Sequence, residues 1–125
     1  MPRPRNPSAP YSRYRAGVPG QPKAVVLPPK CELPVPPIPP QVEDVWTDHQ
    51  KALWRSLWES PQATQWDDAA GLTVAVLVTY SQAILTGTAS AWQAQEARYT
   101  AEALGLTPAA MQKLNWRIAE ADSDD

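Results

Sequence analysis

The sequence predicts an all-α protein, in which a small domain of about four helices follows a proline-rich, basic N-terminal arm. Thirteen of the fifteen prolines lie in residues 1–40, where they remove backbone donors and interrupt helices. Beyond residue 45, apolar residues recur at spacings of three and four, which is typical of helices with one buried face. Capping residues, glycine and proline separate these stretches, so several short helices are expected.

Residues 1–45 are predicted to form a disordered arm. Residues 1–40 contain six basic residues and one acidic residue, and they have too little apolar surface to offset the entropy of ordering the chain. The stretch Leu33–Pro40 is expected to adopt the polyproline II conformation and to act as a semi-rigid spacer. Alternatively, this proline run could dock on an aromatic-lined groove of another protein.

The arm also contains the predicted nucleic-acid contacts. Tyr11-Ser12-Arg13-Tyr14-Arg15 alternates aromatic and basic groups; arginine can pair with phosphate, and tyrosine can stack on an exposed base. The basic residues predicted to contact DNA from the arm are Arg3, Arg5, Arg13, Arg15 and Lys23. The alternative is an arm that only keeps the protein soluble.

Residues 46–121 are predicted to form the helical domain. Thr47 and Gln50 have the spacing of a capping box at the start of the first helix. After this helix, Ser60 can cap a new helical segment and Pro61 suits its first position. A longer helix is expected between Trp66 and Gly87. Its β-branched stretch, Leu72–Tyr80, could also form a strand, but its length and its flanking helical signals favour a helix.

The third predicted helix begins at a second capping-box spacing, Ser90 to Gln93. Six tryptophans are many for a body of this size, because a core this small rarely supplies more than ~3–5 kcal/mol. Some of them could therefore complete their burial against another subunit, although ordinary core packing explains them equally well. The residues predicted at an interface between copies are Trp92, Ala94, Ala97 and Ala101.

A glycine corner joins the third helix to the fourth. Gly105 suits the left-handed position after a helix, Thr107 can cap the next helix, and Pro108 suits its first position. The fourth helix is expected to run from Pro108 to about Ala121, before an acidic tail at residues 122–125. The corner could be purely structural or part of a DNA-reading helix-turn-helix; in the second case, Gln112, Lys113, Asn115 and Arg117 would face the groove.

Several function classes find no support in the sequence. Cys31 is the only cysteine and His49 the only histidine, so neither an internal disulfide nor a zinc cluster is expected. No phosphate-binding loop and no spacing typical of a catalytic triad occurs. We therefore expect a binding protein without a cofactor or metal. No signal peptide or membrane span is expected either, which favours the cytoplasm.

Two stretches go beyond general helix signals. They are Trp54–Trp66, and Leu104–Pro108 together with Asn115–Ile118. Both resemble segments of the small terminase subunits of phages of actinobacteria. The order of the basic proline-rich arm, the tryptophan-rich helix, the long helix and the Leu-Gly-Leu-Thr-Pro corner is also similar. The resemblance implies a non-catalytic factor that forms a ring, binds double-stranded viral DNA and presents it to a separate large subunit carrying the ATPase and nuclease.

One departure from this pattern concerns charge. Residues 41–125 contain five basic and twelve acidic residues, whereas a DNA-gripping body is expected to be basic somewhere. The arm, with Lys113 and Arg117, is therefore the predicted source of DNA contacts. Two other functions compete with a small terminase subunit: a dimeric helix-turn-helix transcription regulator, and a module whose proline-rich arm binds another protein.

Overall fold

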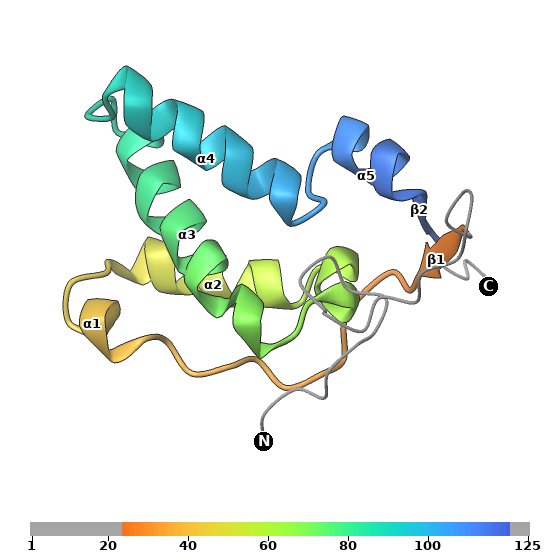
Figure 1. The fold of residues 1–125 in the computed structure, drawn as a ribbon. Coiled ribbons are helices and arrows are strands. Elements are labelled where there is room, and N and C mark those ends of the chain that lie inside the picture. Colours follow the sequence, from red (N-terminus) through yellow and green to blue (C-terminus); the bar gives the residue numbers. More distant parts are fainter. Residues whose placement is uncertain (1–23, 121–125) are drawn as a thin grey trace.

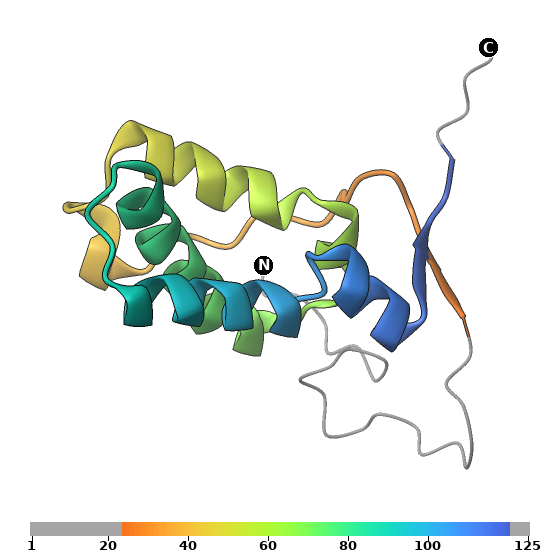
Figure 2. The same cartoon turned by 90° about the horizontal axis from the view of Figure 1, so that it is seen from above.

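Three helices form the body of the protein in the computed structural model, which describes residues 24–120. They are α2 (Asp48–Trp58), α3 (Gly71–Leu85) and α4 (Ala91–Ala103), and α3 contacts both of the others. The short α5 (Pro108–Leu114) and a two-stranded ribbon lie at one end, whereas the turn between α3 and α4 lies at the other (Figures 1 and 2). The predicted all-α class is confirmed, with two three-residue strands added.

Short segments complete the chain between these helices. The one-turn helix α1 (Pro40–Glu43) precedes α2, and two 3-10 segments, η1 (Pro61–Gln65) and η2 (Asp68–Ala70), lead from α2 into α3. The Asp67 side chain accepts a hydrogen bond from the backbone N–H of Ala69, at 3.0 Å, and so caps η2. The stretch Leu72–Tyr80 lies within α3, so the predicted helix is confirmed there.

Both predicted capping boxes are present. The Thr47 hydroxyl accepts from the backbone of Gln50 at 3.2 Å, and the Gln50 side chain accepts in return from Thr47 at 2.9 Å. Ser90 and Gln93 make the same reciprocal pair at the start of α4, at 3.1 and 2.9 Å. Each pair satisfies backbone donors that the first turn of a helix leaves without partners.

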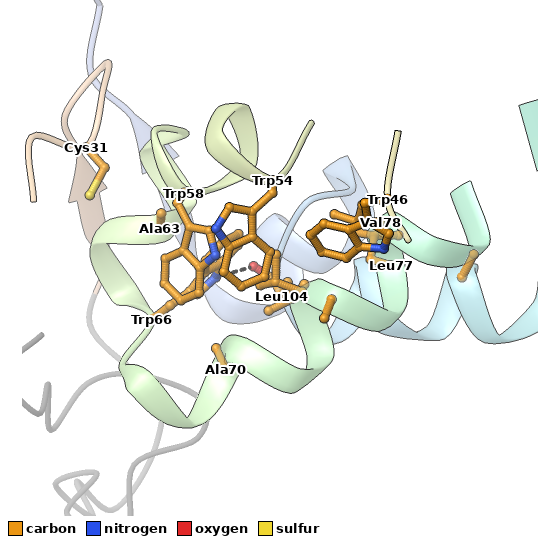
Figure 3. Close-up of a cluster of buried hydrophobic side chains, with 13 residues drawn as sticks. Cys31, Trp46, Trp54, Trp58, Ala63, Trp66, Ala70, Leu77, Val78 and Leu104 are labelled. Carbon is orange, nitrogen blue, oxygen red and sulfur yellow. Dashed lines mark hydrogen bonds between the residues drawn. The ribbon is translucent and has the colours of Figure 1, made fainter. Parts of the chain in front are cut away.

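Four tryptophans form the centre of the core. The ring centroids of Trp46, Trp54, Trp58 and Trp66 follow one another at 5.7, 5.6 and 5.2 Å, and we call this series the tryptophan ladder (Figure 3). All four are buried within one chain. Ordinary core packing therefore accounts for these four residues without a second copy of the chain.

Indole hydrogen bonds connect the ladder to other parts of the fold. Trp46 Nε1 donates to the Thr79 hydroxyl of α3 at 3.2 Å. Trp66 Nε1 donates to the Leu104 carbonyl at 2.9 Å, which attaches the end of α4 to the core (Figure 3). These bonds satisfy polar groups that would be costly to bury alone.

The segment before α1 is part of the fold, contrary to the prediction. Residues Val25–Leu27 form strand β1, Leu27 and Cys31 are buried, and Val35 and Ile38 pack against the core. The prediction that residues 1–45 form a disordered arm is therefore wrong for β1 and for α1. The sequence does not reveal β1 because its partner strand is distant in sequence. The predicted disorder of residues 1–23 and the acidic tail at 122–125 lie outside the described residues.

The proline run Leu33–Pro40, which we call the proline strap, lies against α2. Trp54 Nε1 donates to the Pro36 carbonyl at 3.0 Å, so an aromatic side chain binds the proline run, as in the aromatic-lined grooves that bind PxxP segments. Pro39 has φ −56° and ψ 135°, close to the expected polyproline II values. The strap thus docks on an aromatic side chain of its own chain.

The fourth helix is shorter than predicted. It ends at Leu114, and Asn115 adopts the left-handed conformation with φ 60° and ψ 43°. The chain then forms strand β2 (Trp116–Ile118), which pairs in parallel with β1. The prediction of a helix continuing to about Ala121 is wrong because pairing with β1 and burial of Trp116 outweigh local helical preference.

Candidate nucleic-acid interface

The two-stranded ribbon determines where residues 1–23, which are called the arm from here on, join the body. Val25 lies opposite Trp116 and Leu27 lies opposite Ile118. The Val25 N–H donates to the Asn115 carbonyl at 2.9 Å, and the Ala119 N–H donates to the Leu27 carbonyl at 2.7 Å. Because the strands are parallel, the first described residue lies at the Asn115 end of the ribbon, and the chain leaves β2 at the other end.

Two of the predicted DNA-contacting residues lie beside this junction. Lys113 is exposed in the last turn of α5, where the helix dipole favours a cation. Arg117 is exposed on β2 and lies opposite Val26, so both side chains are on the outer face of the ribbon. The other predicted DNA contacts, Arg3, Arg5, Arg13, Arg15 and Lys23, lie outside the described residues.

The buried side chain of Trp116 packs the ribbon against the glycine corner at Gly105. The Trp116 ring occupies the space that a Cβ atom at Gly105 would enter. Gly105 also has φ 76°, as predicted for the residue after a helix. The sequence therefore predicts the glycine corner, but not the tryptophan packed on it, because Trp116 is expected on a helix until β1 is known to pair with β2.

Further contacts fix the corner between α4 and α5. The Thr107 hydroxyl accepts from the Ala110 N–H at 3.0 Å, as predicted for a cap. Gln62 Nε2 contacts Met111 Sδ at 3.4 Å and so connects α5 to η1. A shallow groove of about 440 Å³ lies between α4 and α5, and Tyr99, Glu102 and Lys113 line it.

The structure contradicts one form of the helix-turn-helix alternative. That form places Gln112, Lys113, Asn115 and Arg117 on a single recognition helix. Only the first two lie on α5, which has seven residues; Asn115 is left-handed, and Arg117 belongs to β2. These four side chains therefore do not form one helical face that could enter a major groove.

The predicted interface residues on α4 separate into two groups. Ala97 is 5% exposed, and Ala101 is half-buried against the same core cluster; α3 and α4 pack closely in this chain. The assignment of Ala97 to an interface between copies is therefore corrected, because its small side chain serves packing within the chain. Ala94 and Trp92 are exposed in the single chain.

The potential metal ligands among the described residues are dispersed. Within residues 24–120, no group of three or more histidine, cysteine, aspartate or glutamate side chains could hold a metal ion. His49 is exposed on α2. The stretch Asp68–Leu85 has the length and apolar composition of a membrane span, but apolar core helices of soluble proteins share these properties, and buried residues of α3 pack in the core.

Comparison with known proteins identifies a family. A family model described as phage terminase small subunit matches residues 5–125. Searches of curated proteins and of solved structures found no match.

Proposed function

We propose a function from one established premise: this chain belongs to the phage terminase small subunit family. We infer that it is a non-catalytic, oligomeric adaptor in the cytoplasm of the bacterial host. It recognises double-stranded viral DNA and passes the DNA to the large terminase subunit, which carries the ATPase and nuclease. The observation that supports this most directly is the pairing of β1 with β2. It places the start of β1, where the basic arm ends, near the exposed residues Lys113 and Arg117.

Charge restricts where this protein can meet DNA. Residues 24–120 contain six basic and ten acidic residues, so most of the body repels a phosphate backbone. Lys113 and Arg117 are exposed near the Asn115 end of the ribbon. Five basic residues precede that point in the chain. The proposed DNA contact therefore consists of the arm together with these two side chains.

The remaining features are compatible with a division of labour between subunits. The sequence contains no Gly-x-x-x-x-Gly-Lys-Ser/Thr loop, the usual cradle for nucleotide phosphates, which agrees with a separate protein that supplies ATP hydrolysis. The alternative function, in which the proline run binds another protein, has less support. The Pro36 carbonyl already accepts a hydrogen bond from Trp54 of the same chain.

The test is DNA affinity measured across a salt series for the intact protein and a variant lacking residues 1–23. Each neutralised phosphate contributes about −0.9 to the slope of log affinity against log salt. Removing five engaged basic residues should therefore flatten the slope by roughly 4.5. The deletion stops before β1, so it spares the ribbon. Equal slopes for the two proteins would contradict the proposed role of the arm.

A second pair of variants tests the body. Lys113→Gln together with Arg117→Gln should flatten the slope by roughly 2 if both side chains contact phosphate. The matched control is Lys51→Gln with Arg55→Gln, which removes the same charge from α2, away from the ribbon. If both pairs change the slope equally, the effect reflects net charge and not a local contact.

A further inference from the structure

One end of the molecule has an unusual surface. No charged residue occurs between Asp68 and Glu96, a stretch that includes all of α3, the turn after it and the start of α4. At the turn, Leu85 is 81% exposed and Trp92 is 59% exposed. Trp92 contacts Tyr80 edge-on, with ring centroids 5.9 Å apart. We call Ile84, Leu85 and Trp92 the apolar tip.

An apolar groove lies at the other end of α3. Its volume is about 730 Å³, and its walls are the proline strap, α1 and the first turns of α3. Trp54 and Trp58 of the tryptophan ladder contribute to its lining, and Leu72, which is 77% exposed, stands at its edge. Since α3 has fifteen residues, the tip and the groove are separated by a helix of roughly 22 Å.

We propose that the apolar tip of one copy inserts into this groove of the next copy. The inference rests on the oligomeric adaptor proposed above and specifies how its copies join. A contact between two different surfaces is head-to-tail, and repetition of such a contact produces a closed ring when the rotation between copies closes. A tip-to-tip contact would instead be isologous and would end at a dimer.

The local charges at the tip and at the groove suit a contact between two copies. Two copies carry the same net negative charge on residues 24–120, and like charges brought together across an interface cost several kcal/mol. The tip lacks charged residues, so it can approach an acidic body without this cost. The groove is lined by one acidic residue, Asp68, and α4 presents the positive end of its dipole beside Trp92. Interface cores are likewise poor in charge and rich in aromatic residues.

The structure provides variants that disable each surface separately. Leu85→Glu with Trp92→Glu places two charges on the exposed tip. Gly71 lines the groove, so the long side chain of Gly71→Glu should block it. The fold should tolerate this substitution, because a Cβ at Gly71 meets nothing within 4 Å and an acid suits the first turn of α3. Gly71→Ala is the matched control for the groove, and Ala103→Glu with Ala109→Glu adds equal charge to exposed positions elsewhere.

The measurement is the native mass of each full-length variant, with far-UV circular dichroism and thermal melting to confirm folding. We expect each disabled variant to be monomeric, whereas both controls keep the mass of the parent. Mixed in equal amounts, the tip variant and the groove variant should form a heterodimer and nothing larger, since one intact tip then meets one intact groove. This rescue requires a head-to-tail contact.

Other results would overturn the inference in distinguishable ways. A groove variant with the parent's mass beside a monomeric tip variant would indicate a tip-to-tip contact. Parent mass in both disabled variants, or a parent that is itself monomeric, would assign the tip to a different partner. If the DNA affinity and salt slope of the parent remain as proposed in that case, only the contact between copies fails; a parent that assembles but does not bind DNA would contradict the proposed function instead.

Discussion

Gly105 has no Cβ atom, and this allows the glycine corner to pack directly against the Trp116 ring. Gly105 and Gly87 have nearly the same backbone, with φ 76° and 78°, but a Cβ at Gly87 meets nothing within 4 Å. Gly87→Ala should therefore cost only the ~1–2 kcal/mol of a left-handed residue with a side chain. Gly105→Ala should cost a further ~1–3 kcal/mol because the new methyl group displaces the buried ring.

Thermal unfolding of the two variants measures the difference directly. In a domain of this size, 1 kcal/mol corresponds to roughly 4–8 °C in Tm, so Gly105→Ala should melt well below Gly87→Ala. Equal melting temperatures would show that Trp116 does not lie against the corner.

Asn115 tests the corrected end of the fourth helix, which lies at Leu114 and not near Ala121. It is the only non-glycine residue with positive φ among residues 24–120, and asparagine tolerates this conformation better than most residues. Asn115→Ala should destabilise the protein by about 1 kcal/mol, and Asn115→Gly should be less harmful. If the helix instead continued through this position, alanine would stabilise it, and the order of the two variants in thermal melting would reverse.

At the scale of elements, β1 distinguishes the folded part of the N-terminal segment from the arm. Deleting residues 1–23 should leave the melting temperature unchanged, because the fold described for residues 24–120 remains intact. Deleting residues 1–30 also removes Leu27, which is fully buried and whose burial is worth about 1.5–3 kcal/mol. The longer deletion should therefore lower the Tm markedly. Equal melting temperatures would mean that β1 contributes nothing to stability.

The elements also show what can be predicted from sequence and what cannot. Thr47, Ser90 and Thr107 were correctly predicted as caps because a cap and its partner lie three residues apart. The ribbon was missed because Val25 and Trp116 pair across almost the whole described chain, and three-residue strands carry no recognisable alternation. The proline strap was predicted as a spacer because its hydrogen-bond donor, the Trp54 indole, comes from another element.

At the scale of the whole molecule, salt should separate the two proposed interactions. DNA binding depends on phosphate contacts and weakens as salt rises. The contact between copies buries uncharged, apolar surface, which screening does not weaken. Raising salt from about 50 to 200 mM should therefore lower DNA affinity by orders of magnitude while the native mass stays constant. Dissociation of the oligomer over the same range would contradict an uncharged interface.

The candidate site was predicted only in part. Exposure of Lys113 and Arg117 follows from their charge, but their position beside the root of the arm depends on the parallel pairing of β1 and β2. The alanines of α4 were predicted at an interface between copies because a stripe of small residues indicates that another helix packs closely. The stripe does not show whether that helix belongs to the same chain or to another copy. The structure shows that α3 of the same chain is the neighbour of Ala97.

The pairing of β1 with β2 also has a consequence for how the protein is made. The ribbon joins two strands whose register partners are 91 residues apart, from Val25 to Trp116, and contacts of such long range form late because they close a large loop. During synthesis from the N-terminus, the basic arm emerges early, but its root has no partner strand until β2 has been translated. Only a finished chain can therefore pair β1, the strand that follows the arm in the chain, with the strand that carries Arg117.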